Sequence, residues 1–440
     1  MKTVITTLSL LLIMSLLSCE ETDKENNKTD AEKPSHVELR KTDGKYRLFV
    51  NGEEFFVNGA GCEYGPCYLV AAHGGNAIRT WRTNNSQKSG LEVLNEAREN
   101  GLMVMMGLDV GLERHGFDYN DSLAVAQQLE RLKGEVLALK DHPALLGWGI
   151  GNELNHRYTN PNVWYAVNDI ANMIKEVDGN HVVTTMLANL REHDVEYISE
   201  RAPSLDFLSI QMYADIINLE ERLKNSGYNG PYLVTEWGAT GHWEVALTSW
   251  GSAIEQTSTE KAEVIMQRYK KAILADETNC LGSFIFLWGQ KQERTPSWYG
   301  LFTENGEKTE PINVMEYFWT GEWPENMAPR LHDISINGKG GRYDNVFLTA
   351  GNAYTLTIKV EHEDMSTLSV RAEIMPEPTE LSDGGDYEPR PTSIEGLIIS
   401  ADTSEILFRA PIKNGPYRLL VYVLDEHNHA ATGNIPFFIN

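Results

Sequence analysis

Two glutamates stand directly after short apolar segments of the sequence. Glu153 closely follows residues 145–151, which read LLGWGIG, and Glu236 ends the apolar run of residues 232–235. Segments this apolar are typical of buried strands, so each carboxyl lies where core gives way to solvent. Two such carboxyls facing each other could cleave a glycosidic bond. One would protonate the departing oxygen, while the other attacks the anomeric carbon or activates water there.

Short apolar segments like these recur as far as residue 289, and segments with helical periodicity lie between them. Residues 162–177 place apolar side chains on one helical face, with Gly179 as the predicted helix cap, and the segment after Asp121 repeats the pattern. This alternation is typical of a parallel sheet covered by helices. The apolar segments number eight: residues 55–61, 76–81, 102–111, 145–151, 181–187, 205–213, 231–238 and 281–289.

Eight such units predict a closed (β/α)8 TIM barrel, in which reactive groups lie at the C-terminal ends of the strands. The alternative is an open doubly wound sheet, but the count of eight and the lack of a glycine-rich phosphate-binding motif favour the barrel. Glu153 then follows the fourth strand and Glu236 ends the seventh, so the carboxyls face each other across the mouth. The other side chains at strand ends are Arg79 and Trp81 (second strand), Asp109 (third), Tyr213 (sixth) and Trp288 (eighth).

Aromatic residues are concentrated in two long segments after the seventh and eighth strands. Their rings could stack on several successive sugars, although at least one of them is expected to pack in the core instead. Taken singly, a glutamate is usually a surface charge and a tryptophan is usually core, so the conjunction at the strand ends carries the interpretation. The four aromatic residues are Trp243, Trp250, Trp298 and Tyr299.

At these motifs the sequence resembles the retaining glycoside hydrolases of clan A. The resemblance covers about residues 50–319, and its most specific parts are HPALLGWGIGNELN, YLVTEWG and LWGQKQERTPSWYGLF. The barrel is similar to a family 2 catalytic domain, but the usual N-terminal jelly-roll and sandwich domains are absent. This departure argues against a simple β-galactosidase or β-glucuronidase. A barrel followed by an immunoglobulin-like sandwich resembles the endo-β-1,3-glucanases of family 158.

The resemblance implies a role for each residue at the strand ends. Glu153 would be the acid/base, Asn152 would bind the substrate 2-hydroxyl, Glu236 would be the nucleophile that Arg79 and Tyr213 hold ionised and oriented, and Trp288 would form the floor of the sugar site. An acid working near neutral pH needs a raised pKa, which apolar surroundings and the charge of its partner would supply. Further predicted substrate-binding or supporting residues are Trp81, Asp109, Trp243 and Trp298.

The periodicity of the sequence changes after the barrel. Residues 331–440 alternate with a period of two between turn residues, which predicts an immunoglobulin-like β-sandwich. The predicted catalytic domain therefore spans residues 36–326, beginning with a short hairpin region, and the sandwich spans residues 327–440.

The N-terminal residues predict export and lipid anchoring. Residues 1–19 have one early lysine, a short apolar run and small residues before Cys19, as in a lipoprotein signal peptide with a lipobox. The alternative is a plain signal peptide with an incidental cysteine. Residues 20–35 have almost nothing apolar to bury and are predicted to be a disordered tether. We therefore expect an exported lipoprotein anchored to a membrane, with the outer membrane favoured.

Charge and cysteine content limit the partners further. A net charge of -25 argues against nucleic acid, because phosphate binding needs a basic face. Cys62 and Cys67 could close a small disulfide loop, or they could be buried thiols like Cys280, and the sequence favours neither. No zinc-binding spacing occurs, so neither metal nor cofactor is expected. The segment ERHGFD from Glu113 is interpreted as a solvated loop that could line a cleft.

The expected function is a retaining β-glycoside hydrolase acting on a β-linked polysaccharide or oligosaccharide, with an endo-β-glucanase on β-1,3-glucan favoured. One alternative is an exo-acting β-glycosidase of the β-galactosidase or β-mannosidase type. A second is a catalytically dead barrel that binds glycans at the surface. A binding protein has no need to retain Glu153, Asn152, Glu236 and Arg79 together, so the enzyme is favoured. Transglycosylation would use the same residues.

Overall fold

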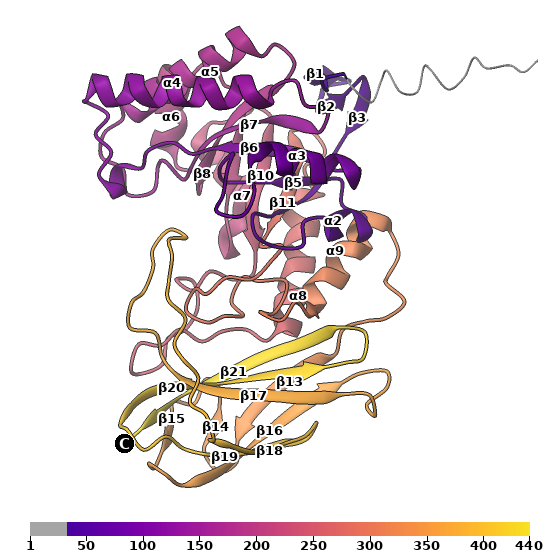
Figure 1. The fold of residues 1–440 in the computed structure, drawn as a ribbon, viewed down its shortest axis with the longest axis vertical. Coiled ribbons are helices and arrows are strands. Elements are labelled where there is room, and N and C mark those ends of the chain that lie inside the picture. The colour runs from indigo at the N-terminus through magenta and orange to yellow at the C-terminus, as the bar shows by residue number, and fades with distance from the viewer. Residues whose placement is uncertain (1–32) are drawn as a thin grey trace, which may run out of the picture. The chain divides into compact units, whose positions relative to one another are not determined.

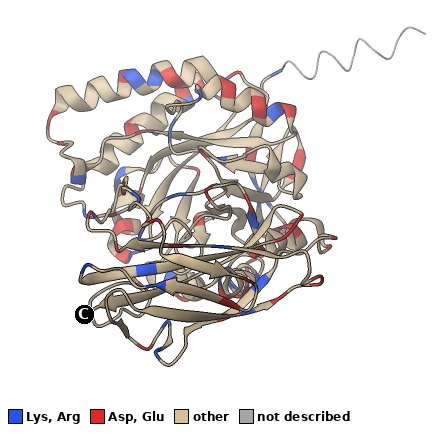
Figure 2. Cartoon of the chain, turned by 60° about the horizontal axis from the view of Figure 1, so that its bottom comes forward, with Lys and Arg blue, Asp and Glu red and all other residues tan. Residues whose placement is uncertain are grey.

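The computed structural model describes residues 33–440, a barrel followed by two further sheets (Figure 1). The signal segment, Cys19 and residues 20–32 lie outside the described residues. Within the described part, no helix is long and apolar enough to cross a membrane. In the view of Figure 2, Lys and Arg are scattered among Asp and Glu over barrel and sheets.

Eight parallel strands close into the barrel, in the order β10-β11-β4-β5-β6-β7-β8-β9. Each predicted apolar segment overlaps one barrel strand, so the predicted barrel is confirmed. Because both faces of every strand are buried, the strands are nearly uniform in apolar character rather than alternating. The strands are β4 (Val57–Gly61), β5 (Ala77–Arg79), β6 (Met103–Leu108), β7 (Leu145–Asn152), β8 (Val182–Ala188), β9 (Phe207–Gln211), β10 (Tyr232–Gly238) and β11 (Cys280–Phe286).

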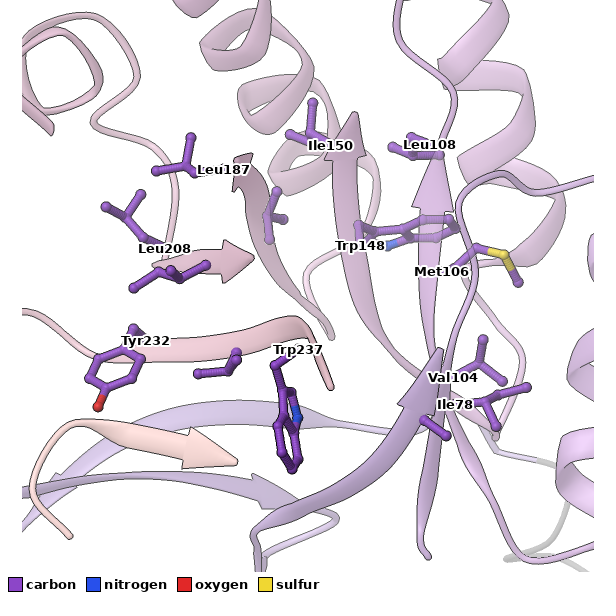
Figure 3. Packing of buried hydrophobic residues seen from close by; sticks show 14 of the residues in the cluster. Ile78, Val104, Met106, Leu108, Trp148, Ile150, Leu187, Leu208, Tyr232 and Trp237 are labelled. Carbon is purple, nitrogen blue, oxygen red and sulfur yellow. The ribbon is translucent and has the colours of Figure 1, made fainter. Parts of the chain in front are cut away.

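The barrel strands bury two apolar layers. Inside the barrel, side chains such as Met105, Leu146 and Phe284 fill the interior. Outside it, a larger cluster packs the strands against the helices, and Figure 3 shows part of this layer around Trp148 and Trp237. The filled interior makes the lower barrel a rigid support for whatever the strand ends carry.

Helices surround the barrel. The predicted helices after Asp121 and around residues 162–177 are both present, but Gly179 is not the cap. Asp178 ends that helix in an extended conformation, and its carboxylate accepts a hydrogen bond from the indole of Trp148 at 2.7 Å. The helices are α2 (Leu69–Ala72), α3 (Gly90–Glu99), α4 (Ser122–Leu139), α5 (Val163–Val177), α6 (Glu192–Arg201), α7 (Leu219–Ser226), α8 (Ser258–Arg268) and α9 (Glu310–Thr320).

A small antiparallel sheet precedes the barrel, where the sequence predicts a short hairpin region. It contains β1 (Val37–Thr42), β2 (Lys45–Val50) and β3 (Glu53–Phe55). Asp43-Gly44 and Asn51-Gly52 connect the strands with positive φ at all four residues, as two-residue hairpin turns require. The sheet packs Val37 and Leu48 into the cluster that fills the barrel interior, so it helps to close that core.

The C-terminal residues form two five-stranded sheets that are mainly antiparallel. The two sheets enclose a single apolar core that includes Leu331, Phe408 and Val421. One sheet contains β12 (Lys308–Thr309), β15 (Val346–Leu348), β17 (Ser369–Pro376), β20 (Gly415–Leu424) and β21 (His429–Ile439); the other contains β13 (Arg330–Ile336), β14 (Gly340–Gly341), β16 (Ala353–Glu361), β18 (Ile398–Ala401) and β19 (Glu405–Arg409).

Buried charged residues join the sheets to the barrel. The guanidinium of Arg418 donates to the carbonyl of Ala253 at 2.8 Å and to the side chain of Asn434 at 2.6 Å. Asn434 in turn donates to Glu255 at 2.5 Å, and Lys261 also pairs with Glu255. Because removing one partner of a buried ion pair leaves a charge uncompensated, this network holds the sheets firmly on the barrel.

Part of a long connection between β17 and β18 extends away from the sheets. Residues 377–397 contain no strand or helix, and in Figure 1 the orange-yellow connection extends from the sheets toward the barrel. Its contacts with the barrel bear directly on the site.

Candidate active site

Glu236, near the end of β10, is the hydrogen-bonding centre of the barrel mouth. Its Oε1 accepts from Arg79 Nη1 at 2.8 Å, from the Trp81 indole at 2.8 Å and from Gln211 Nε2 at 3.0 Å. Its Oε2 accepts only from the Tyr213 hydroxyl, at 3.1 Å. Four donors thus fix the carboxylate in a single orientation, and Oε2 is its less engaged oxygen.

Arg79 links Glu236 to Asn152, the last residue of β7. Its Nη1 also donates to the carbonyl of Thr235 at 2.9 Å, and its Nη2 donates to Asn152 Oδ1. Gln211 donates to the same Asn152 oxygen at 2.8 Å. Sequence reasoning missed Gln211, although its position as a polar residue two places before Tyr213 at the end of an apolar strand was a usable signal.

Glu153 follows β7 in a left-handed backbone conformation with φ of 52°. This region is unfavourable for most residues other than glycine, and such strain is retained where surrounding contacts enforce it. Here the Glu153 amide donates to the carbonyl of Met186 at 3.0 Å. Behind it, buried Asn155 donates to Asp194 at 2.7 Å, so a polar network supports the turn that presents Glu153.

The environment of Glu153 favours a protonated carboxyl, whereas four hydrogen-bond donors surround Glu236. The carboxyl of Glu153 opens on a cavity but is otherwise enclosed by protein. This desolvation, reinforced by the negative charge of Glu236, raises the pKa of Glu153 to about 8. Glu153 therefore carries a proton near neutral pH, while Glu236 accepts four hydrogen bonds. A proton donor beside an oriented carboxylate is the pairing that glycosidic bond cleavage requires.

The two glutamates face a cavity of about 620 Å³ at the C-terminal ends of the strands. Six more of the predicted site residues line it, whereas Arg79 and Trp298 are buried and do not. The predicted residues on its wall are Trp81, Asp109, Asn152, Tyr213, Trp243 and Trp288.

A second cavity, of about 340 Å³, lies on the other side of Glu153. Glu153, Tyr213 and Trp243 line both cavities, whereas Glu236 lines only the larger one. The site therefore has room on both sides of the proton donor.

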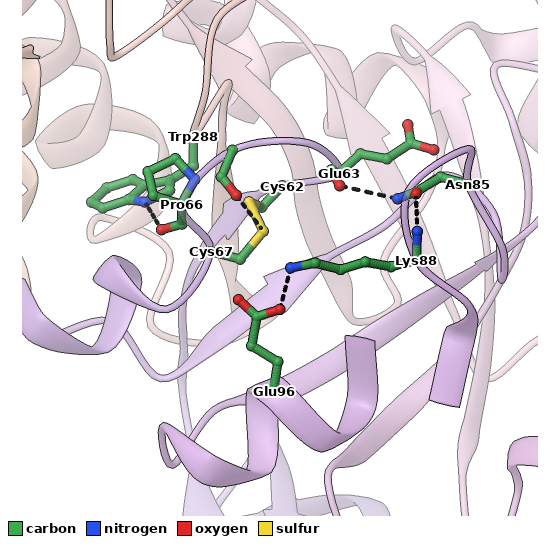
Figure 4. Close-up of a disulfide and its surroundings, with 9 residues drawn as sticks. Cys62, Glu63, Pro66, Cys67, Asn85, Lys88, Glu96 and Trp288 are labelled. Atoms are coloured by element: carbon green, nitrogen blue, oxygen red, sulfur yellow. Dashed lines mark hydrogen bonds and ion pairs between the residues drawn. A yellow bond between two sulfur atoms is a disulfide. The ribbon is translucent and has the colours of Figure 1, made fainter. Parts of the chain in front are cut away.

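Trp288, predicted to form the floor of the sugar site, belongs to the lining of the larger cavity. Its indole is fully buried, packs against Trp319 and Phe302, and donates to the carbonyl of Pro66 at 3.2 Å (Figure 4). A ring enclosed in this way has no free face for a sugar. Phe286, at the end of the same strand, also lines the cavity and contacts Trp81, Tyr213 and Tyr299 edge-on. The sequence concealed this because two aromatic residues follow each other closely at that strand end.

Of the four loop aromatic residues, Trp243 is the one that is strongly exposed at the cavities. Trp298, predicted to bind or support the substrate, is buried in a cluster with Tyr213 and Phe286, and its indole donates to the carbonyl of Thr240 at 2.9 Å. Trp250 packs against Phe347 of the C-terminal sheets. Tyr299 is almost buried but reaches the cavity wall. The expectation that at least one of the four is core is confirmed.

Further charged residues line the larger cavity without having been predicted. Hydrogen bonds from His242 and Lys291 hold the pKa of Glu293 below its usual value, although burial acts to raise it. Burial raises the pKa of Glu63, which pairs with Arg82 at 2.7 Å. In residues 33–440 no cluster of three His, Cys, Asp or Glu side chains is placed to hold a metal ion.

The cysteine alternatives are resolved by geometry. Cys62 and Cys67 form a disulfide, whereas Cys280 is a buried free thiol. The disulfide closes the loop that carries Glu63 and Tyr64 to the cavity wall (Figure 4).

The chain matches the family model described as glycosyl hydrolases family 2, TIM barrel domain, over residues 69–302. No curated protein matches the chain. Among solved structures, it is similar to a β-glucuronidase from Bacteroides uniformis, with 14% identity, a TM-score of 0.48 and coverage of 92% of this chain and 48% of that one. It is also similar to a family 5 mannosidase from Rhizomucor miehei, with 15% identity, a TM-score of 0.47 and coverage of 64% of this chain and 96% of that one. The chain thus spans about half the length of the β-glucuronidase.

The raised pKa of Glu153 predicts a pH-dependent stability change. Between the ordinary glutamate value of 4.5 and about 8, the folded state holds a proton that the unfolded state has lost. The contribution of Glu153 to the free energy of unfolding therefore falls as pH rises through this window. Gln cannot ionise, so Glu153→Gln should unfold at a higher temperature than the native protein, by a margin that grows from about pH 5 to about pH 8. Thermal unfolding across this range measures the margin.

The matched control is Glu130→Gln, which changes an exposed glutamate on α4 and should leave the melting temperature close to native at every pH. A margin for Glu153→Gln that stays constant with pH would contradict the assigned protonation of Glu153.

Proposed function

We propose that this chain, which belongs to the family described as glycosyl hydrolases family 2, TIM barrel domain, is a retaining β-glycoside hydrolase. The observation that carries the proposal is the contrast between two carboxyls at the strand ends. Glu236 is held by four donors, and Glu153 has a pKa raised to about 8. Two carboxyls with opposite environments can divide acid and nucleophile roles between them.

In the proposed mechanism, Glu236 attacks the anomeric carbon through Oε2. This oxygen accepts one hydrogen bond, from Tyr213, whereas Oε1 accepts three. As the new bond forms, negative charge leaves the carboxylate, and Tyr213 and the Oε1 donors keep the group aligned. A covalent glycosyl-enzyme results, and its hydrolysis returns the carboxylate.

Glu153 supplies the proton in the first step and removes one in the second. Its proton passes to the departing glycosidic oxygen. Once Glu236 is esterified, its charge no longer raises the pKa of Glu153. The pKa of Glu153 therefore falls, and the carboxylate left by the first step can take a proton from the incoming water. The same coupling thus suits both halves of the reaction.

Asn152 is proposed to bind the 2-hydroxyl of the sugar. Its Oδ1 accepts hydrogen bonds from Arg79 and Gln211, which orients the amide and leaves Nδ2 as the donor for substrate. Hydrogen bonds to the 2-hydroxyl strengthen in the transition state of this reaction.

The two-glutamate mechanism predicts that Glu236→Ala and Glu153→Ala each reduce turnover by about a hundredfold or more, since nucleophile and acid are both lost outright. Initial-rate assays on an unactivated substrate measure the loss. Azide should partly rescue Glu236→Ala and give the inverted glycosyl azide. Glu130→Ala on α4 is the control and should retain native activity. Near-native activity of either cavity variant would refute the role given to that residue.

The proposed substrate is a β-linked polysaccharide cleaved internally, with β-1,3-glucan favoured by the resemblance to family 158. Space on both sides of Glu153 supports internal cleavage, because an internal bond needs sugars bound on either side of it. Exposed Trp243 borders both cavities and is suited to stack on a sugar near the scissile bond.

Internal cleavage predicts that an early digest of β-1,3-glucan contains a ladder of oligosaccharides in the β-anomeric form. Chromatography measures the ladder, and proton NMR identifies the first-formed anomer. Exclusive release of monosaccharide would favour exo action, and activity on β-mannan or β-galactan alone would overturn the β-glucan assignment. Longer products than the starting oligosaccharide would indicate transglycosylation, and binding without cleavage would indicate a glycan-binding protein.

The proposal also covers the fold of the C-terminal domain and the localisation of the protein. The two sheets around one core support an immunoglobulin-like sandwich. The lipobox sequence ending at Cys19 supports an exported, lipid-anchored protein, with the outer membrane favoured.

Lipid anchoring predicts that the full-length protein sediments with membranes when expressed in a bacterium that processes lipoproteins. Cys19→Ala removes the sulfur that would carry the lipid, so this variant should appear in a soluble fraction. Cys280→Ser is the control, because it alters a buried thiol outside the signal sequence and should leave the distribution unchanged. A native protein found in the soluble fraction would refute the anchor.

A further inference from the structure

A loop of the C-terminal sheets crosses the mouth of the barrel. We call residues 382–388, within the connection between β17 and β18, the strap. On one side of the mouth, Asp383 pairs with Arg157 at 2.8 Å, beyond β7. The carbonyl of Gly384 accepts from Arg114 at 3.1 Å, and Asp386 pairs with His115 at 2.9 Å, both beyond β6.

On the other side of the mouth, the strap contacts the segment beyond β11. The carbonyl of Gly385 accepts from Lys291 at 2.7 Å. Buried Glu388 accepts from the backbone amide and from the guanidinium of Arg294, each at 2.7 Å. Since β7 and β11 stand opposite each other in the order of the closed barrel, these contacts carry the strap across the mouth.

The strap is built to fit this position. Glu388 also accepts from the backbone amide of Ser382 at 3.0 Å, which closes the base of the strap. Gly384 and Gly385 both have positive φ, and a Cβ at Gly384 would lie 3.1 Å from Arg114 and His156 side-chain atoms. Glycine is therefore needed where the strap bends most closely against the barrel.

The strap borders both cavities: Asp383 lines the smaller one, Gly385–Tyr387 line the larger one, and Gly384 lines both. Glu236 reaches only the larger cavity, so the sugar that is attacked at its anomeric carbon binds there. This makes the larger cavity the glycone side. The smaller cavity, reached by Glu153, takes the departing part of the chain.

Tyr387 is the residue of the strap whose exposed ring is available to a ligand. It exposes 88% of its surface, lines the larger cavity and is part of a strap that ion pairs and a buried carboxylate hold in place. Tyr64, on the disulfide-closed loop, is a second exposed aromatic residue on the same wall. Exposed rings on anchored loops can stack on sugars with little loss of conformational entropy.

We propose that the strap is part of the substrate-binding site and that Tyr387 stacks on a pyranose ring at a glycone subsite beyond the sugar that is attacked. The inference rests on the glycoside hydrolase function proposed above. It assigns the C-terminal sheets a part in glycan recognition, because they supply this residue to a cavity whose catalytic groups come from the barrel.

The kinetic test uses nitrophenyl β-1,3-gluco-oligosaccharides of increasing length and the full chain. For the native protein, kcat/KM should rise with each sugar that fills a glycone subsite. For Tyr387→Ala the deficit should grow with length and reach about tenfold on the longest substrate, since one stacking contact is lost. Tyr387→Phe retains the ring and should follow the native curve. Tyr343→Ala, another exposed tyrosine of the C-terminal sheets but not of the cavity wall, is the matched control.

The second variant tests the ion pair that holds the strap in place rather than the ring of Tyr387. Glu388→Gln weakens the ion pair with Arg294 and should reproduce the length-dependent deficit by releasing the strap. A deficit in Tyr387→Ala that is equal at all lengths, or no deficit on the longest substrate, would overturn the assigned subsite.

A binding assay distinguishes the failure of this inference from the failure of the proposed function. Glu153→Ala and the double variant with Tyr387→Ala are run through gels containing β-1,3-glucan, β-mannan or β-galactan. Weaker retardation of the double variant supports the subsite, whereas equal migration of both proteins in all three gels overturns it. If the native protein cleaves none of these glycans but Tyr387→Ala still weakens retention, the hydrolase proposal fails and the binding site stands.

Discussion

The buried guanidinium of Arg79 is the interaction on which the mouth of the barrel depends. It lies at the end of β5, yet it donates to Glu236 and Thr235 of β10 and to Asn152 of β7. A charge this deeply buried is tolerable only when it is paired and hydrogen-bonded. The need to satisfy Arg79 therefore fixes three strand ends relative to one another, and the filled barrel interior beneath keeps them rigid.

The same constraint separates the environments of the two glutamates. Arg79 and three neutral donors converge on Glu236, whereas Glu153 projects from a left-handed turn into a partly enclosed cavity. Desolvation and the nearby charge of Glu236 then keep a proton on Glu153. Neither environment is a property of its residue alone, because each depends on what the other strands bring to the mouth.

The C-terminal sheets extend this arrangement beyond the barrel. Arg418 and Glu255 fix the sheets on the barrel side, and the strap then has a short path to the mouth. Glu388 closes the base of the strap on Arg294. A second domain in this position can shape the cavity without altering the two glutamates, in keeping with the general separation of a barrel scaffold from variable loops.

The sequence by itself determined the barrel, its eight strands and the positions of Glu153 and Glu236, because buried parallel strands leave a clear apolar signal and catalytic groups follow their ends. It did not determine which aromatic rings face the cavity. The side chains of Trp288 and Trp298 are buried, whereas Trp243 is exposed at the cavity, and this depends on packing between segments far apart in the chain. Nor did it reveal Gln211 as a shared donor or the strap over the mouth. Those contacts join residues from different strands and from two domains, so only the tertiary structure could decide them.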